Sequence, residues 1–528
     1  MNRRTLIKTI LSGFGISLFG CDLGGEEDNS SPKEKELIFP QSVASGDPTP
    51  SGIVLWTRIN PDFIQDKKVK YQIAEDKDFN NIVVEGYENI NTDSNYTVKV
   101  FINNQLNSWT TYYYRFIYQN TISKVGRFKT LPEKNQDISE LKFAYMSCQD
   151  YVNGYFTSYP HVVSEDVDFV IWLGDYIYEE IEDPSSMVRD INLPSGYTVV
   201  HSLEDYYYLY NTYKSDKNLQ LLHENFAFIP VWDDHEYAND CYGYHAPDHD
   251  YKNDDTKLKK LRLEATKAWY ENLPVNVPYN PDAQDIYNIQ IYRSFKFGQL
   301  AELILTDERL YRSSHPCGEG GYGERYITTG CENEKLDDRT MLGDTQKNWF
   351  LNKVKNSDSK WIFWCNPVMF MKFKIDKYYL DFDAWDGYQY ERSKIIQKIK
   401  SYKNDGYIEN FVVLTGDLHS FVAGNISEDF ENDYVFPEFI SGAVSSSNLA
   451  EILKKDYGFS DPRLLEGIIE NSNEHIKYLN SHEHGYGIVR VKKDEIKISF
   501  KMVSTVKKEK ADIKQIKSFI LKDGESKI

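Results

Sequence analysis

The sequence has no excess of positive charge, and this excludes one large class of function. Its 61 lysines and arginines are outnumbered by 81 aspartates and glutamates, which gives a formal net charge of −20 at pH 7. Because the basic residues are scattered along the chain, we expect no nucleic-acid-binding surface. The same acidity means that a phosphate-bearing ligand needs local positive charge, supplied by arginines or by metal ions.

Two common catalytic motifs are also missing. A cysteine-dependent phosphatase needs an arginine six positions after its nucleophile. The five cysteines after Cys21 have other residues at that position, namely Gly154, Pro247, Gly323, Asp337 and Met371. No G-x-S-x-G sequence is present, which disfavours a serine hydrolase. Hydrolysis through a cysteine or serine nucleophile is therefore not expected.

The N-terminal apolar run is too short to span a membrane and is typical of an export signal. Arg3 and Arg4 precede an apolar stretch from Leu6 to Phe19, shorter than the roughly 20 residues of a spanning helix. Residues 1–20 resemble a twin-arginine signal that ends in a lipoprotein box at Cys21. We therefore expect an exported lipoprotein, periplasmic or on the cell surface, held to the membrane by a lipid on Cys21. Ordinary cleavage without a lipid is the alternative.

Two regions of different pattern follow a polar stretch, residues 21–35, which predicts a flexible tether. Residues 36–134 contain short alternating runs rich in β-branched and aromatic residues, separated by Asp, Asn, Pro and Gly. They predict an all-β sandwich of the immunoglobulin or fibronectin III type, with a supporting role. Residues 135–506 alternate continuous apolar runs with long polar segments, which predicts an α/β layered domain. The lysine-rich tail, residues 507–528, is predicted to be helical.

Four apolar runs of the second region end in side chains that can bind metal ions. In chain order these are Cys148, Asp175 with Tyr178, Asp234 with His235, and Asp417 with His419. Ligand sites of α/β sheets lie at the carboxyl ends of the strands, where loops converge. So many acids in one crevice would repel one another unless cations neutralised them. The pattern therefore predicts a metal centre.

These motifs resemble the calcineurin-like metallophosphoesterases and, more closely, the PhoD-type alkaline phosphatases. SCQ, GDYIY, WDDHE, LTDERLYR, MLGDTQKNWF, AWDGY and TGDLHS follow one another in the order of that family. The resemblance implies a four-layer αββα sandwich for the second domain. It also implies hydrolysis of phosphomonoesters or phosphodiesters, or both, by a metal-bound hydroxide. The alternative is a non-catalytic surface lipoprotein that binds calcium or phosphorylated polymers.

The chemistry of the ligands divides the predicted centre into a softer and a harder half. The spacing from Asp175 to Tyr178 resembles the G-D-x-x-Y motif of purple acid phosphatases, in which a phenolate binds ferric iron. A cysteine thiolate also suits a transition metal, so Cys148, Asp175, Tyr178 and His419 are the predicted Fe(III) ligands. Asp234, Asp417 and a bridging Asp175 offer hard oxygens that suit Ca²⁺ or a similar divalent ion. The family resemblance implies iron with calcium, and other divalent metals remain open.

Two further groups have predicted roles in catalysis. His235 is placed to orient or protonate the leaving oxygen, because an imidazole is a natural proton donor near neutral pH. Arg309 and Arg312 follow the apolar run AELIL. The two arginines either clamp the phosphate by bidentate hydrogen bonds, with Arg309 as the predicted catalytic residue, or form a structural ion pair with Asp307.

Three other residues are assigned with alternatives. Asn366, after WIFWC, either completes the set of metal ligands or caps the backbone at the end of a strand. Cys317 and Cys331 can form a disulfide outside the cytoplasm, although the sequence does not establish the pairing. We expect a monomer with a phosphoester substrate.

Overall fold

The computed structural model describes residues 31–181 and 187–528. The predicted signal and residues 21–30 of the predicted tether lie outside these ranges. In the part that is described, every helix is too short or too polar to cross a membrane.

Residues 32–35 belong to a helix, which corrects the end of the predicted flexible tether. Helix α2 (Pro32–Ile38) begins with a capping box: the Ser31 hydroxyl accepts the Glu34 N–H, and the Glu34 carboxylate accepts the Ser31 N–H. Proline suits the first helical position, because its missing N–H has no intrahelical partner there. Ile38 is buried and fixes the helix to the all-β region that follows.

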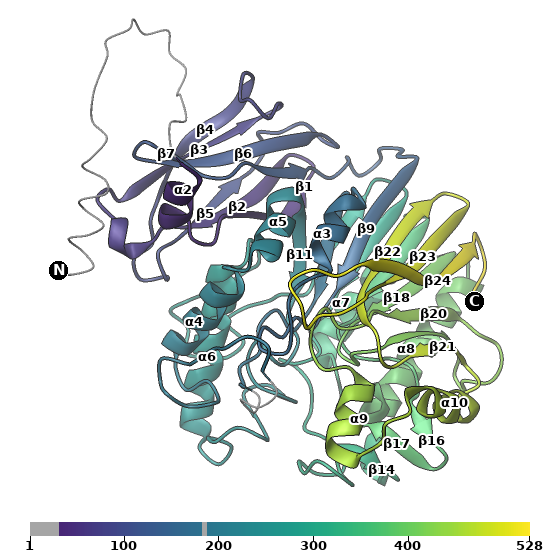
Figure 1. The fold of residues 1–528 in the computed structure, drawn as a ribbon. Coiled ribbons are helices and arrows are strands. Elements are labelled where there is room, and N and C mark those ends of the chain that lie inside the picture. Colours follow the sequence, from purple (N-terminus) through teal and green to yellow (C-terminus); the bar gives the residue numbers. More distant parts are fainter. Residues whose placement is uncertain (1–30, 182–186) are drawn as a thin grey trace, which may run out of the picture.

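The largest sheet has nine strands and runs through most of the molecule (Figure 1). In spatial order the strands are β24 (Ile513–Lys522), β23 (Glu495–Val503), β22 (His484–Lys492), β9 (Glu140–Met146), β10 (Phe169–Leu173), β11 (Ala227–Val231), β1 (Val43–Thr49), β2 (Gly52–Arg58) and β5 (Thr97–Ile102). Strands β9, β10 and β11 are parallel. Their carboxyl ends therefore lie at one edge of the sheet.

A second sheet has seven strands. In spatial order these are β12 (Arg293–Phe297), β13 (Ala301–Leu305), β15 (Trp361–Cys365), β18 (Asn410–Thr415), β20 (Phe436–Ile440), β19 (Phe421–Ile426) and β21 (Ile476–Asn480). Strands β13, β15 and β18 are parallel. Most of these strands are buried along their whole length, as their continuous apolar sequences predict.

The two large sheets share one apolar core. Phe143 of β9 meets Phe363 of β15 edge to face at 5.5 Å, and Phe169 of β10 stacks on Phe297 of β12 at 4.6 Å. Helices α7 (Gly343–Lys355) and α8 (Gln389–Asn404) contribute to a second core on the other face of the seven-stranded sheet. The prediction of an α/β domain with covered sheets is confirmed as a mixed α/β fold with several sheets.

The remaining helices and the smallest sheet border these layers. The helices are α3 (Tyr159–Ser164), α4 (Leu203–Tyr213), α5 (Lys217–Asn225), α6 (Asp255–Asn272), α9 (Leu449–Tyr457) and α10 (Pro462–Ser472). Short 3-10 turns lie at Pro61–Phe63, Glu332–Lys335 and Trp385–Tyr388. The three-stranded sheet contains β14 (Tyr326–Thr328), β17 (Tyr378–Asp381) and β16 (Lys374–Ile375). Figure 1 shows this sheet at the same end of the molecule as α9 and α10.

The N-terminal region is all-β, but one of its sheets continues into the α/β part. Strands β4 (Ile82–Asn89), β3 (Lys68–Ala74), β6 (Thr111–Tyr118) and β7 (Thr121–Ile122) form a separate sheet, with β8 (Gly126–Lys129) paired to β6. This sheet shares a core with β1, β2 and β5. Strand β1 also pairs in parallel with β11, with Ser45 opposite Ala227. The two parts of the chain are therefore joined by a continuous hydrogen-bonded sheet.

The C-terminal tail forms a strand, so the prediction of a helix for residues 507–528 is wrong. Strand β24 pairs antiparallel with β23, from Lys522 opposite Glu495 to Ile513 opposite Val503. Phe519 packs against Phe500 at 5.7 Å, while most lysines of the strand face solvent. A segment that combines three lysines with a few packed apolar residues suits the edge of a sheet, where charge discourages pairing with other chains.

Candidate metal centre

The carboxyl ends of the two sets of parallel strands bring the predicted ligands together. Backbone hydrogen bonds join the loop after β9 to the loop after β10: the Cys148 N–H donates to Gly174 O at 3.3 Å, and the Gln149 N–H donates to Asp175 O at 3.1 Å. The loop after β20 joins them through the Val444 N–H, which donates to Ser147 O at 3.1 Å. Loops from both large sheets thus meet at one place, as the strand-end pattern predicts.

Glycine is required immediately before two of the predicted ligands. Gly174 has a φ of +92°, and a Cβ there would lie 2.3 Å from the Cβ of Asp233. A Cβ at Gly416 would lie 2.6 Å from the Ser147 hydroxyl oxygen and 3.1 Å from Leu173 O. The two G-D sequences therefore reflect close backbone approach, which only glycine allows.

Four of the seven predicted metal ligands have a left-handed backbone conformation. The φ angles are 61° at Cys148, 57° at Asp175, 59° at Asp417 and 54° at His419. Positive φ is uncommon outside glycine, and such conformations concentrate at functional sites, where surrounding structure holds them in place. The backbone is thus bent to aim these side chains into a common space.

The softer half of the centre is a compact cluster of donors. The Tyr178 hydroxyl oxygen lies 3.0 Å from Asp175 Oδ2 and 3.1 Å from His419 Nε2. One donor atom each from Cys148, Asp175 and His419 lies within 4.8 Å of the others. Asp175 Oδ1 is buried and has no hydrogen-bond partner among the residues that the structure describes. A buried carboxylate oxygen without a donor is costly, so this donor set fits a metal ion.

Two serines that sequence reasoning missed orient this half. The His419 Nδ1–H donates to Ser447 O at 2.7 Å, which leaves Nε2 with a lone pair facing Tyr178 and Asp175. The Ser446 hydroxyl lies 2.7 Å from the Tyr178 oxygen and 2.9 Å from Cys148 O. Both serines follow β20 in the sequence SGAVSSSN, which has no acid, histidine or cysteine to mark it.

The electrostatics of the softer half show what a bound cation would change. Burial raises the pKa of the Cys148 thiol well above its usual range, and the charge of Asp175 raises it further. Burial and the same charge raise the pKa of the Tyr178 phenol. Both groups would therefore remain protonated at neutral pH without a bound Lewis acid, which is what deprotonates such ligands.

The harder half lies beside it and shares Asp175. Asp175, Asp234 and His235 form a second group whose donor atoms lie within 4.8 Å of one another. Burial raises the pKa values of Asp234 and Asp417, and the charges of neighbouring aspartates raise them further. Asp234 Oδ1 accepts the His235 N–H at 2.9 Å, and its Oδ2 accepts the Asp240 N–H at 2.7 Å. Asp175 belongs to both groups, as a bridging ligand must.

Arg309 provides positive charge inside this acidic pocket. Its side chain is fully buried, and its guanidinium pairs with Asp233 and, at 2.6 Å, with Asp383. The Nη2 atom lies 3.6 Å from Asp234 Oδ2 and 3.7 Å from Asp417 Oδ1 and makes no hydrogen bond. The guanidinium therefore lies among the carboxylates of the harder half.

Arg309 forms ion pairs, as one of its two alternatives has it, but with Asp233 and Asp383 in place of Asp307. Asp307 Oδ1 instead accepts the backbone N–H of Arg309 at 3.0 Å, which shapes the turn after β13. Arg312 also pairs with Asp383, at 3.0 Å. His315 Nε2 lies 2.7 Å from Asp383 Oδ1. Asp383 does not follow one of the apolar runs that mark the predicted ligands, so sequence reasoning did not assign it to the site.

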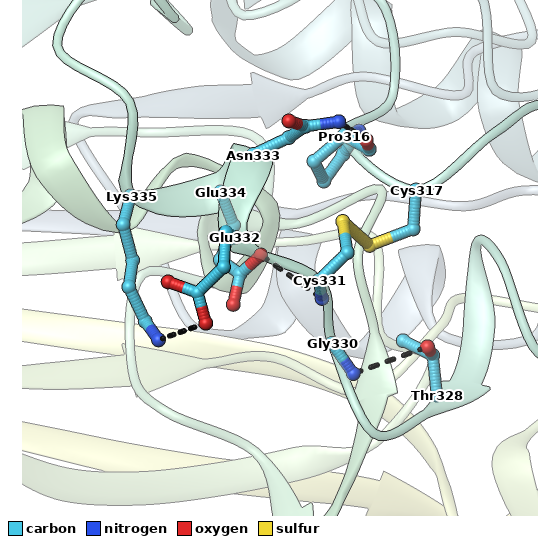
Figure 2. Close-up of a disulfide and its surroundings, with 9 residues drawn as sticks. All are labelled: Pro316, Cys317, Thr328, Gly330, Cys331, Glu332, Asn333, Glu334 and Lys335. Carbon is cyan, nitrogen blue, oxygen red and sulfur yellow. Dashed lines mark hydrogen bonds and ion pairs between the residues drawn. A yellow bond between two sulfur atoms is a disulfide. The ribbon is translucent and has the colours of Figure 1, made fainter.

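A disulfide closes the loop of residues 317–331 next to these groups. Figure 2 shows the bond between Cys317 and Cys331, whose Cα atoms are 5.8 Å apart, and this settles the pairing that the sequence left open. The Glu334 carboxylate accepts the Cys331 N–H at 3.1 Å. Within the bridged loop, Arg325 pairs with Asp240, which in turn donates its N–H to Asp234. The disulfide therefore supports the outer side of the acidic pocket.

Asn366 makes the backbone contact that was its alternative assignment. Its Nδ2 donates to Val368 O at 2.5 Å, and its Oδ1 accepts the Trp385 indole N–H at 3.1 Å. The side chain is buried at the end of β15. Its role as a metal ligand stays a prediction.

His235 is a partly exposed member of this cluster, and one of its ring nitrogens is already engaged. Its side chain is 17% exposed, its Nδ1 lies 2.7 Å from Glu179 Oε2, and its ring centroid is 4.1 Å from that of Tyr178. Burial opposes its protonation, but the charges of Glu179, Asp234 and Asp175 raise the pKa of His235 well above its usual range. The residue thus has the position of a proton donor, with Nδ1 held by Glu179.

Comparisons with known proteins agree with this arrangement. The PhoD-like phosphatase family matches residues 143–500, and the N-terminal domain of PhoD-like phosphatases matches residues 25–132. Alkaline phosphatase D of Bacillus subtilis (strain 168) is 31% identical over 539 aligned positions, which cover 98% of this chain and 87% of that protein. A solved structure titled "Structure of PhoD" is similar with a TM-score of 0.81 and 29% identity, over 93% of this chain and 92% of that one. The chain therefore belongs to the PhoD-like phosphatase family and is a phosphoric ester hydrolase.

Proposed function

We propose that this hydrolase is an exported, metal-dependent phosphoesterase whose metal centre is built from the strand-end side chains. The observation that carries the proposal is the cluster of Cys148, Asp175 and His419 donor atoms within 4.8 Å, with a buried Asp175 oxygen that has no hydrogen-bond partner in the described part of the chain. Thiol, carboxylate and imidazole donors converging on one point are the ligand set of a transition metal. The two packed sheets that present these loops support the four-layer sandwich as the architecture of the catalytic part.

We assign the ions by the chemistry of their donors. Cys148, Asp175, Tyr178 and His419 would hold Fe(III), while Asp175, Asp234 and Asp417 would hold Ca²⁺ or another divalent cation. When bound, the ions supply Lewis acidity, which activates water and offsets charge on the phosphoryl group. Because the Cys148 thiol and the Tyr178 phenol must lose protons to bind, metal affinity should fall as the pH is lowered.

The chain's own residues then account for the remaining steps. Asp175 holds the two halves of the site in register, and His419 is kept in one tautomer by Ser447 O. His235 donates its proton to the leaving oxygen as the ester bond breaks. Arg309 lowers the repulsion between the pocket's carboxylates and an incoming phosphate, because its charge lies among Asp233, Asp383 and Asp234.

Phosphomonoesters and phosphodiesters are both proposed substrates, since the leaving group is recognised by loops around the pocket and not by the metal ligands. A non-catalytic binder of calcium or phosphorylated polymers would have no use for a proton donor such as His235. Export is supported by the twin arginines and the lipoprotein-like sequence before Cys21. On this proposal the protein lies on the outer side of a membrane and is held there by an N-terminal lipid.

The test is metal analysis of protein purified without chelators, combined with assays on a matched monoester and diester. We expect bound iron, and a visible colour from charge transfer between Fe(III) and the thiolate and phenolate of Cys148 and Tyr178. A colourless, iron-free preparation with full activity would contradict the assignment of the softer half. Absence of activity on both ester types in metal-loaded protein would contradict the proposed function itself.

A further inference from the structure

Glu179 is a buried acid beside the pocket that none of the roles above includes. It follows Tyr178 in the loop after β10, and its side chain is only 3% exposed. Its Oε2 atom lies 2.7 Å from His235 Nδ1, and its Oε1 atom accepts the Asn239 N–H at 2.7 Å. One carboxylate thus holds both the side chain of His235 and the backbone four residues further along the same loop.

The contact between Glu179 and His235 Nδ1 determines which ring nitrogen of His235 is available to the substrate. A carboxylate oxygen can only accept, so Nδ1 carries a hydrogen in both the neutral and the charged imidazole. Nε2 has no hydrogen-bond partner among the residues that the structure describes. The Tyr178 ring, 4.1 Å from the His235 ring, restricts rotation from one face. The Glu179 contact at Nδ1 and the Tyr178 ring therefore fix the orientation of the imidazole. Nε2 is the ring nitrogen that is left without a partner among the described residues.

We propose that Glu179 is a positioning residue that directs the Nε2 proton of His235 to the leaving group, and this rests on the proposed function. In the step it supports, a P–O bond forms to the oxygen of water while the ester P–O bond breaks. The Nε2 proton moves to the departing oxygen, which leaves as an alcohol. Neutral His235 keeps its Nδ1–H on Glu179, and the proton lost by the water restores the imidazolium through solvent.

Glu179→Gln separates this role from a purely structural one. The amide oxygen can still accept the Asn239 N–H, so the loop contact is preserved, but the charged acceptor for Nδ1–H is lost. Glu466→Gln is the matched control. Glu466 holds His482 through an Nδ1 contact of 2.8 Å and accepts the Ser481 N–H at 2.7 Å, and it belongs to no group assigned to the centre.

The assay compares two phosphate monoesters that differ in their need for a proton donor. 4-Nitrophenolate is stable as an anion and leaves with little help, whereas an alkyl alkoxide must be protonated as it departs. We expect Glu179→Gln to lower kcat for an alkyl phosphate by about 100-fold, the typical contribution of a general acid. The loss with 4-nitrophenyl phosphate should be several-fold smaller. Metal content and the urea unfolding midpoint should match those of the unmodified protein.

The other possible results would contradict either the role of Glu179 or the proposed function. An equal loss of kcat for both esters, an unchanged kcat for both, or a loss of bound metal would overturn the positioning role of Glu179. Glu466→Gln should leave the ratio of the two rates unchanged, and a similar shift there would also overturn it. If the unmodified, metal-loaded protein hydrolyses neither ester, the proposed function fails instead, because the role of Glu179 is read only from the ratio of two measurable rates.

Discussion

Replacing Gly174 by alanine tests whether the loops after β10 and β11 need the close approach seen in the structure. The added Cβ would lie 2.3 Å from the Cβ of Asp233 and 2.7 Å from its backbone nitrogen, at a φ of +92°. The left-handed backbone costs an L-residue about 1–2 kcal/mol. Overpacking against a fixed neighbour adds roughly 1–3 kcal/mol. We therefore expect Gly174→Ala to lower the free energy of unfolding by about 2–5 kcal/mol.

Gly196→Ala provides the matched control, because Gly196 has a φ of +78° and nothing within 4 Å of an added Cβ. This variant should show only the backbone cost, about 1–2 kcal/mol. Urea unfolding of both variants, at equal metal occupancy, gives the steric contribution as their difference. Because Asp175 follows Gly174 directly, only Gly174→Ala should also weaken metal binding. Equal stability of the two variants would refute the close approach of these loops.

The remaining predictions concern pH and membrane attachment. Burial, together with the charges of Lys372 and Arg392, lowers the pKa of His475 to about 3. Since an unfolded histidine titrates near 6.5, the unfolded chain binds more protons between these values, so stability present above about pH 6.5 is lost as the pH falls. The loss amounts to about 3 kcal/mol by pH 4. His475→Gln keeps a donor for Lys372 O and should flatten the pH dependence of urea unfolding; an unchanged slope would contradict this origin. Cys21→Ser should move the exported protein from the membrane fraction to the soluble fraction, and continued membrane attachment would exclude the lipid anchor.

The general layout could be predicted because local sequence patterns encode it. Period-two runs mark the strands of the N-terminal region, and continuous apolar runs mark buried strands such as β10 and β18. The pairing of β1 with β11 has no such signal, since it joins residues about 180 positions apart. The tail was misjudged because a lysine-rich segment fits a solvated helix as well as an edge strand, and only its pairing with β23 decides between them.

In the candidate site, too, residues marked by the local sequence could be predicted, whereas residues placed by tertiary contacts could not. Cys148, Asp175 and Asp417 could be identified because each stands directly after an apolar strand. Glu179 and Asp383 were missed because their partners, His235 and Arg309, come from other loops and are brought to them only by folding. For Arg309 the sequence offered Asp307 of the same motif as one possible partner, whereas its charge is shared among acids from three other segments.

The most direct test of the metal centre is the Asp175→Ala variant, because Asp175 joins the group with Cys148 and His419 to the group with Asp234 and His235. Metal content per chain and the rates of monoester and diester hydrolysis would be measured beside those of the unmodified protein, with circular dichroism as the check of folding. Convergence of the strand ends on shared cations predicts a folded variant that has lost bound metal and activity toward both esters. A folded variant with undiminished metal content and full phosphatase activity would show that the reaction occurs elsewhere.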